Sequence, residues 1–277
     1  MTIINGLSVD LEDWYQGLTS TNPLRQAWPT FESRVLRNTE LLLDLLAKHN
    51  TRATFFTLGY VAERFPDLIS QVEAAGHEIG VHGYWHYMVD RLTLDAFAEE
   101  IDRALACLTP MVRGPLIGHR APYFSINHRS LWALDLLAER GFRYDSSFFP
   151  ARNSLSGYPK APRFPHRLGG NQGMVEFPVS TARLFGMNWP IAGGIYLRAL
   201  PYWFIKWSIN RLHRQGQPAI MYLHPYDLDT EQSVPVATPR EWLVRYCNRR
   251  GSLGKLRRLL RDFRFAPLRE LLDTVGE

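Results

Sequence analysis

The segment that decides the fold reads Gly76-His-Glu-Ile-Gly-Val-His-Gly-Tyr-Trp-His86. Its first half predicts a short buried strand over 77–81, and this strand leads directly to His82 and His86. In β/α barrels the residues that follow the carboxyl ends of the strands build the active site. The two histidines are four residues apart, so they would lie on one face if this stretch were helical, and they could then hold one metal ion.

Patterns typical of strands and helices alternate on both sides of this segment. Residues 2–10 and 53–57 are predicted strands, and apolar residues at helical spacing predict a helix over 34–48 between them. The later patterns predict helices after Pro66 and at 94–108, 130–140, 202–215 and 252–261, and strands ending near Arg120 and at 174–179 and 219–223. This alternation predicts an α/β fold, namely a distorted β/α barrel of about seven parallel strands.

One stretch interrupts the alternation. Residues 145–195 contain repeated prolines and glycines, so we interpret them as an elaborated loop over the mouth of the barrel. No internal repeat divides the chain. We therefore expect a single domain over 1–277, with a barrel core over 1–230 and a helical C-terminal extension over 231–277.

The composition indicates a globular chain with a modest positive charge. The 277 residues are 45% hydrophobic, and 32 basic against 27 acidic residues give a formal net charge of +5. This excess favours anionic surroundings such as phosphorylated lipid carriers, anionic glycans or anionic lipids, and we expect no nucleic-acid partner. Cys107 and Cys247 lack metal-ligand spacing. Because we find neither a leader pattern nor a long apolar run, we expect a cytoplasmic protein that can associate with a membrane surface.

An acidic cluster follows the first predicted strand and consists of Asp10, Glu12 and Asp13. Side chains two residues apart on an extended chain point the same way, so Asp10 and Glu12 can enter the barrel mouth together, while Asp13 lies opposite or around the turn. A metal held by two imidazoles still needs an anionic ligand, so one carboxylate would bind the metal and another would act as a base. The alternative is a solvated acidic turn.

Two more strand ends bring residues that amide hydrolysis requires. Leu223-His-Pro-Tyr-Asp227 places His224 at the mouth, where a protonated imidazole would donate to the leaving nitrogen. Gly118-His-Arg-Ala-Pro-Tyr123 places Arg120 there, where a bidentate contact would fix the carboxylate of the base. Each residue alone has a structural alternative, namely a loop hydrogen bond or a surface ion pair. The convergence of four strand ends favours a metal-assisted hydrolysis.

These segments, in this order, resemble the motifs of the polysaccharide deacetylase family (NodB homology, carbohydrate esterase family 4). The resemblance rests on Ala53-Thr-Phe-Phe-Thr-Leu-Gly-Tyr-Val-Ala-Glu-Arg64, on residues 76–86, on Arg120-Ala-Pro-Tyr123 and on Leu223-His-Pro225. Stretches at 8–14, 144–147, 176–178 and 259–265 are similar to the subgroup encoded with exopolysaccharide and exosortase loci, which carries a C-terminal extension. The resemblance covers nearly the whole chain and implies a NodB-type barrel.

The resemblance implies a role for each site residue. Asp10 would be the catalytic base and His224 the catalytic acid, with Arg120 orienting the base and Asp145 tuning the acid. His82 and His86 would hold a divalent ion, most simply Zn²⁺, together with one carboxylate.

That carboxylate is the departure from the family pattern. Most of the family has two adjacent aspartates, whereas this chain has Asp10 and then Glu12 and Asp13. Relatives with an Asp-x-Asp pattern would make Glu12 the ligand, and a tight turn would favour Asp13. We choose Glu12.

The implied reaction removes an N-acetyl group from an amino sugar of a polysaccharide or a glycan precursor. We expect Tyr123 and Trp85 to contact the sugar, and a backbone N–H near Tyr123 to hold the oxyanion. Other aromatic residues could stack on a sugar or belong to the core, namely Tyr84, Trp189, Tyr196 and Trp203. Two alternatives stay open: hydrolysis of a small amide or ureide, as by allantoinase-like relatives, and glycan binding without catalysis. The sequence names neither the sugar nor the oligomeric state.

The last predicted helix belongs to a strongly basic segment, Arg249 to Arg264. Its apolar positions form one stripe, namely Leu253, Leu256, Leu260 and Phe263. We expect this stripe to dock on the barrel and the basic side chains to face outward. They would then form a solvated helix face or contact an anionic membrane leaflet.

Overall fold

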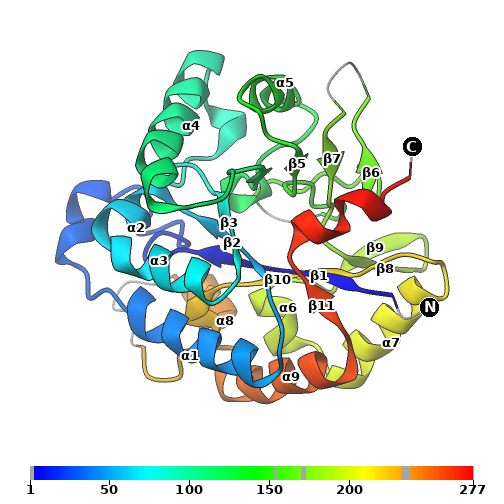
Figure 1. The fold of residues 1–277 in the computed structure, drawn as a ribbon. Coiled ribbons are helices and arrows are strands. Elements are labelled where there is room, and N and C mark those ends of the chain that lie inside the picture. Colours follow the sequence, from blue (N-terminus) through cyan, green and yellow to red (C-terminus); the bar gives the residue numbers. More distant parts are fainter. Residues whose placement is uncertain (1–2, 153–154, 170–172, 233–237, 277) are drawn as a thin grey trace.

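One sheet of parallel strands organises the structure, a computed structural model that describes residues 3–152, 155–169, 173–232 and 238–276 (Figure 1). Along the sheet the strands follow the order β10-β1-β2-β3-β4-β5-β7-β6, and every pair except β6 with β7 is parallel. The parallel strands are β1 (Asn5–Leu11), β2 (Thr54–Thr57), β3 (Glu78–Val81), β4 (Gly118–His119), β5 (Tyr144–Asp145), β7 (Val175–Glu176) and β10 (Ile220–Leu223). The prediction of about seven parallel strands is confirmed.

The two ends of this parallel set meet. Ser180, shortly after β7, donates its backbone N–H to the carbonyl of Ile220 in β10 at 3.0 Å, and its Oγ accepts the N–H of Ile220 at 2.8 Å. These bonds curl the sheet into a distorted barrel. The carboxyl ends of the strands therefore gather at one rim, where barrel enzymes build their active sites.

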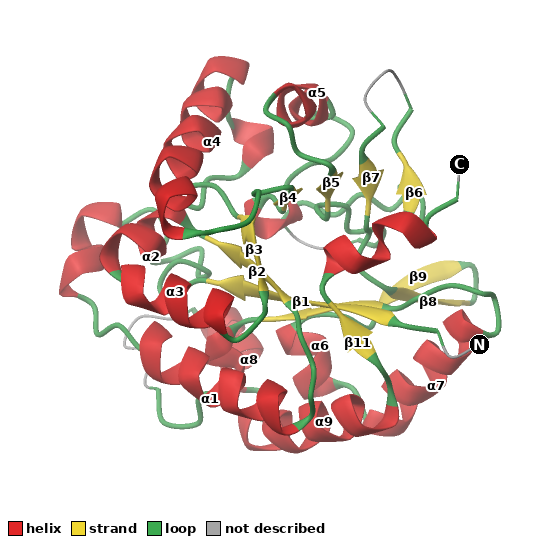
Figure 2. Cartoon of the chain, in the orientation of Figure 1, coloured by secondary structure: helices red, strands yellow, loops and turns green. Residues whose placement is uncertain are grey.

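Helices cover the outside of the sheet (Figure 2). They are α1 (Val35–Lys48), α2 (Gly59–Arg64), α3 (Pro66–Ala74), α4 (Leu94–Leu108), α5 (Trp132–Glu139), α6 (Gly194–Ala199), α7 (Tyr202–His213), α8 (Pro239–Tyr246) and α9 (Arg249–Asp262). The helices predicted at 34–48, 94–108 and 202–215 are present. The short α2 and α6 escaped prediction because six residues are too few to show a helical period. None of the described helices is both long and apolar enough to span a bilayer.

The segment 145–195 is more regular than the predicted loop. It contains β6 (His166–Arg167), which pairs with β7, and a separate hairpin of β8 (Thr181–Leu184) and β9 (Met187–Pro190). The strand predicted at 174–179 is β7, shortened to two residues.

The C-terminal extension is also not purely helical. After α9 the chain forms β11 (Phe265–Ala266), which pairs with β1, and a 3₁₀ helix, Leu268–Thr274. Leu268 and Leu271 of this 3₁₀ helix pack with Phe56 and Ile220 of the sheet in a second core cluster. The extension is therefore part of the barrel's packing.

Helix α9 docks through its apolar stripe, as predicted. Leu256 and Leu260 are buried, and Leu253 and Phe263 are partly buried against the core. Two of the basic residues also turn inward: Arg249 is buried, and Lys255 Nζ donates to the carbonyls of residues 198 and 200 at 2.6 and 2.7 Å. The exposed basic side chains are Arg250, Arg257, Arg258, Arg261 and Arg264.

Asp13 ties the end of β1 to the start of α1. Its Oδ2 accepts hydrogen bonds from Ser33 Oγ at 2.6 Å and from the backbone N–H of Arg34 at 3.0 Å, and its Oδ1 accepts the N–H of Trp14 at 2.9 Å. Arg34 is the N-cap of α1, so Asp13 satisfies donors that the helix leaves open. The Asp13 side chain is buried in these contacts, so its role is structural.

We predict that Asp13→Ala lowers the free energy of unfolding by about 1–3 kcal/mol, because it leaves buried donors without an acceptor. Asp13→Asn, which keeps one acceptor oxygen, should cost less. Chemical denaturation measures both, with Asp44→Ala on the exposed side of α1 as the control, expected within about 0.5 kcal/mol of the parent. A loss no larger than that of the control would contradict the structural role.

Candidate active site

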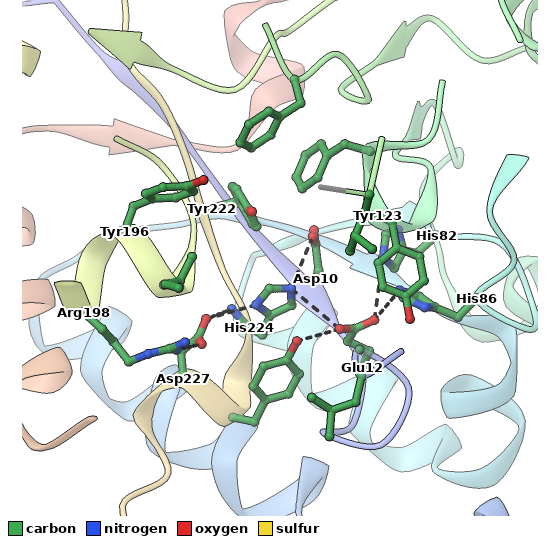
Figure 3. A pocket seen from close by; sticks show the side chains of 18 residues that line it. Asp10, Glu12, His82, His86, Tyr123, Tyr196, Arg198, Tyr222, His224 and Asp227 are labelled. Atoms are coloured by element: carbon green, nitrogen blue, oxygen red, sulfur yellow. Dashed lines mark hydrogen bonds and ion pairs between the residues drawn. The ribbon is translucent and has the colours of Figure 1, made fainter. Parts of the chain in front are cut away.

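A cavity of about 240 Å³ opens at the carboxyl ends of the parallel strands (Figure 3). Asp10 enters it from the end of β1, His82 from the turn after β3 and His224 from the turn after β10. The segment that follows the β8–β9 hairpin forms another wall through Ile195 and Tyr196 of α6. The sequence analysis placed the first three residues at this rim, and the structure brings them together.

Glu12, His82 and His86 form a buried cluster with the donor set of a metal site. One ligand atom from each lies within 4.8 Å of the others. Glu12 Oε2 is 2.6 Å from His86 Nε2 and 3.9 Å from His82 Nε2. Two imidazoles and one carboxylate, with a position left open, are a ligand set of catalytic zinc.

The backbone of the histidine segment differs from the helical possibility. Residues 82–86 form a turn, in which Gly83 has φ +74° and His86 has φ +57°. Glu100 Oε2 holds this turn by accepting the N–H groups of Tyr84 and Trp85 at 3.2 and 2.9 Å. The two rings therefore meet through a reversal of the chain and not through a helical repeat.

Each ligand is oriented by a second contact. His82 Nδ1 lies 2.7 Å from the carbonyl of Arg120, which accepts the ring N–H and leaves Nε2 toward the cluster. Glu12 Oε1 accepts the hydroxyl of Tyr226 at 2.8 Å, whereas Glu12 Oε2 has no hydrogen bond of acceptable geometry within the described ranges. A Cβ on Gly17 would lie 2.5 Å from both Glu12 Oε1 and the Tyr226 hydroxyl, so only glycine leaves room for this pair.

The charge states suit a cation. Burial alone would raise the pKa of Glu12, but the neighbouring His86, His224 and His82 lower it to about 2. Burial lowers the pKa of His82 to about 4, so this imidazole is neutral near neutral pH, as a metal ligand must be. An ionised carboxylate whose Oε2 faces His86 Nε2 at 2.6 Å, together with the neutral imidazole of His82, fits a divalent ion.

Arg120 fixes Asp10, as predicted, but through one oxygen. Arg120 Nη1 donates to Asp10 Oδ1 at 2.7 Å and to Ser8 Oγ at 2.8 Å, while Nε and Nη2 donate to the carbonyl and hydroxyl of Ser146. The predicted bidentate contact is therefore wrong. The other oxygen, Asp10 Oδ2, stays available at the cavity, 3.9 Å from His224 Nε2.

Asp227, and not Asp145, is the partner of His224. Asp227 Oδ2 lies 3.0 Å from His224 Nδ1 and accepts the His224 backbone N–H at 2.8 Å, and Asp227 Oδ1 pairs with Arg198 of α6. Burial lowers the pKa of His224, but the charge of Asp227 outweighs it and raises that pKa. Gly194 lies against the Asp227 carboxylate, where any Cβ would collide. Asp227 belongs to the segment Leu223-His-Pro-Tyr-Asp227, but its contact with His224 was not predicted from the sequence.

Asp145 lies behind the site. Its Oδ1 is 2.7 Å from His119 Nδ1 and accepts Ser147 Oγ at 2.8 Å, and its Oδ2 accepts the Ser147 N–H at 2.9 Å. Burial and the charge of Asp145 raise the pKa of Glu176 well above its ordinary value, which favours the neutral form of Glu176 beside Asp145. This network adjoins Ser146, which holds Arg120. Asp145 therefore supports the Arg120–Asp10 pair from behind.

The aromatic predictions divide. Tyr123 lines the cavity, with its ring 4.6 Å from that of His86 and its hydroxyl 3.2 Å from the carbonyl of Gln16. Trp85 does not line it and packs against Trp28 and Tyr60 instead. Of the other aromatic candidates, only Tyr196 lines the cavity. The remaining aromatic residues that line the cavity are Phe124, Phe149, Tyr222 and Tyr226. Asp13 and Asp145 are likewise absent from its lining.

Comparison with known proteins points to one family. Residues 20–144 match the model of the polysaccharide deacetylase family, and residues 146–273 match a domain of unknown function, DUF3473. A peptidoglycan-N-acetylglucosamine deacetylase of Bacillus cereus is 34% identical over 101 residues, which are 36% of this chain and 37% of that protein. A peptidoglycan deacetylase of Helicobacter pylori is 28% identical over 38% of this chain and 35% of its own length. The matches thus span little more than a third of these relatives.

Solved structures agree on the fold. A Mycobacterium smegmatis protein assigned to the polysaccharide deacetylases superposes with a TM-score of 0.65 at 20% identity, over 99% of this chain and 94% of its own. A family 4 carbohydrate esterase from Streptomyces lividans gives 0.51 at 16% identity, over 95% and 91%. The chain therefore contains a polysaccharide deacetylase domain of the NodB, carbohydrate esterase 4 type over residues 20–144, followed by a DUF3473 domain over residues 146–273.

Proposed function

We propose that this protein is a divalent-metal-dependent deacetylase that hydrolyses the N-acetyl group of an amino sugar in a polysaccharide or glycan precursor. One observation carries the proposal: a carboxylate base, an imidazole acid and a three-ligand cluster face the same cavity of about 240 Å³. Amide hydrolysis needs each of these, because water is a weak nucleophile and an amine leaves poorly without a proton. The named deacetylases among the relatives support this reaction class.

Glu12, His82 and His86 would hold the metal ion. When bound, such an ion supplies Lewis acidity, which polarises a carbonyl group and increases the acidity of water. Zn²⁺ is our choice because two imidazoles and a carboxylate are a frequent zinc set.

Asp10 and His224 would share the proton transfers. Asp10 is held through Oδ1 by Arg120 and uses Oδ2 to take a proton from water. As the proton leaves, the oxygen of this water molecule bonds to the acetyl carbon. His224, held through Nδ1 by Asp227, donates from Nε2 to the sugar nitrogen as the C–N bond breaks. The backbone N–H of Tyr123 would donate to the carbonyl oxygen. Acetate and a free amino sugar result.

The cavity walls favour a sugar over a small ureide. Tyr123, Tyr196 and Phe149 offer aromatic faces on which a sugar ring can stack. A solved allantoinase shares the fold, with a TM-score of 0.54, but at 18% identity this likeness speaks for the fold alone. The complete set of base, acid and ligands also disfavours glycan binding without catalysis. An exopolysaccharide substrate and a cytoplasmic location remain parts of the proposal.

The direct test is mass spectrometry of N-acetylated glycans, such as chitin oligomers and lipid-linked precursors, after incubation with zinc-loaded protein. The expected result is loss of one or more acetyl groups from at least one glycan, with free acetate released in equal amount. Allantoin serves as the competing substrate. Turnover of allantoin with every glycan untouched would overturn the proposal.

We predict that Glu12→Gln weakens zinc binding more than the roughly 10–100-fold typical of losing an outer contact, because it removes a ligand charge. His86→Ala should behave in the same way. Isothermal titration and elemental analysis measure this, with Asp13→Asn as the matched acidic control, expected to keep one ion per chain. The opposite ranking, with zinc lost only in Asp13→Asn, would move the ligand to Asp13.

We predict that Asp10→Asn lowers kcat by about 10²–10⁴-fold while zinc stays bound, because the amide keeps the shape of the side chain but cannot act as a base. Steady-state kinetics paired with zinc titration separates the two effects. Activity within a few-fold of the parent would exclude Asp10 as the base.

For the acid, we predict that Asp227→Asn lowers kcat by about 10²-fold, at the low end of the range for general acid catalysis, because it removes the charge that keeps His224 protonated. The control is Asp229→Asn in the same turn, whose carboxylate pairs with Arg34 outside the cavity and should leave kcat near the parent value. If Asp145→Asn lowered kcat while Asp227→Asn did not, our assignment of the acid's partner would be wrong.

A further inference from the structure

The β8–β9 hairpin forms a two-stranded sheet of its own beside the main sheet (Figure 1). The register of its strands gives it two unlike faces. Its strands pair only with each other, with Ala182 opposite Trp189 and Leu184 opposite Met187. Opposite residues in an antiparallel pair share a face, so these four apolar side chains lie together. The other face carries Thr181, Arg183, Asn188 and Pro190. The turn, Phe185-Gly186, has positive φ at both residues, as tight hairpins require.

The polar face is the one that contacts the rest of the protein. Asn188 Nδ2 donates to the carbonyl of Pro150 at 2.7 Å, and Arg163 donates to the carbonyl and hydroxyl oxygens of Thr181 at 2.7 and 3.1 Å. On the apolar face Ala182 is buried in the core at the base of the hairpin, whereas Met187, Trp189 and the turn residue Phe185 are exposed to solvent. Phe185 is 94% exposed, Met187 57% and Trp189 47%. Exposed apolar side chains grouped in this way usually mark a binding surface.

Three arginines gather beside this hairpin, from three different segments. Arg163 is hydrogen-bonded to Thr181, and Arg183 lies two residues further along the same strand, on the same face of the hairpin as the Thr181 side chain. Partial burial and the positive charges of Arg183 and Arg211 lower the pKa of Arg163. In the described part of the chain, none of the three forms an ion pair with a carboxylate. Crowded like charges of this kind are stabilised by an anionic partner.

We infer that the hairpin tip and these three arginines bind the surface of an anionic lipid bilayer. Phe185, Met187 and Trp189 would enter the boundary between headgroups and acyl chains, where aromatic side chains are favoured, and the arginines would meet lipid phosphates. A soluble anionic polymer would neutralise the arginines but leave the apolar face exposed. A bilayer matches both chemistries at once.

The basic face of α9 lacks this combination. Its exposed side chains include Arg257 and Arg261, but the apolar residues of α9 are buried or partly buried against the core. We therefore place the membrane contact at the hairpin and not at α9. The hairpin also leads, after Pro190 and the intervening Ile191–Gly193, into Gly194 and Tyr196 of the cavity wall. A docked hairpin would thus keep the cavity near the lipid surface, a link that rests on the proposed function, whereas the membrane contact does not.

Co-sedimentation of the full chain with vesicles tests the inference without using turnover. The probes are vesicles of phosphatidylglycerol mixed with phosphatidylcholine, and of phosphatidylcholine alone. We expect binding to the anionic vesicles that weakens as salt shortens the screening length. Arg183→Glu should weaken it at least about fivefold, the effect of one charge near the leaflet. Phe185→Ser and Trp189→Ser should weaken it as well.

Matched controls separate this surface from net charge and general hydrophobicity. Arg257→Glu on α9 makes the same charge change, and Leu94→Ser on α4 removes a side chain that is 51% exposed elsewhere. Both should bind like the parent, and every variant should keep the parent's zinc binding. Equal losses for Arg183→Glu and Arg257→Glu would overturn the inference. So would retention by a soluble anionic polysaccharide without sedimentation on anionic vesicles.

Discussion

The buried guanidinium of Arg120 is the interaction on which the site depends. Removing a charge from water is costly unless hydrogen bonds and an opposite charge replace the solvent. Arg120 meets this demand with hydrogen bonds to Ser8 and Asp10 on one side and to Ser146 on the other, and the ring of Phe56 lies 4.4 Å from its guanidinium carbon. Its backbone carbonyl accepts the ring N–H of His82. One residue thus orients the proposed base Asp10, fixes the proposed metal ligand His82 and links β1 to the segments that follow β3 and β5.

In the second half of the chain, His224 is likewise held in place by a buried charged pair, Asp227 and Arg198. Asp227 joins His224 to Arg198, so an imidazole at the end of β10 is held by a helix that begins at the cavity wall. The family boundary near residue 145 therefore runs through the active site: His82, His86 and Arg120 lie in the polysaccharide deacetylase match, whereas His224 lies in the DUF3473 match. Pairing of β1 with β10 brings the halves together, with Val9 opposite Leu223 immediately before the base and the acid. Neither half contains a complete set of catalytic groups.

Further hydrogen bonds keep Arg120 and Glu12 in place. Glu176, whose pKa is raised by burial and by Asp145, lies beside Asp145. Asp145 in turn contacts His119 and holds Ser147 next to Ser146, which binds Arg120. Tyr226 takes one oxygen of Glu12 and leaves the other toward the histidines. These groups are distant from one another in sequence. As a result the two carboxylates have different partners: Asp10 is paired with the guanidinium of Arg120, whereas Glu12 faces the imidazoles of His82 and His86.

The sequence by itself determined the strand–helix alternation, the barrel class and six residues of the site: Asp10, Glu12, His82, His86, Arg120 and His224. These were predictable because each lies at or directly after the carboxyl end of a strand, and parallel strands bring these ends to one rim. Only the tertiary structure decided what lies behind them. Asp13 caps α1, Asp145 lies behind the base, Trp85 packs away from the cavity, and Asp227 with Arg198 takes the place assigned to Asp145. Such pairings depend on how loops fold back and which side chains face each other, and no local period in the sequence records that. The hairpin's two faces were hidden for the same reason, because a strand pattern does not show which face the rest of the protein will cover.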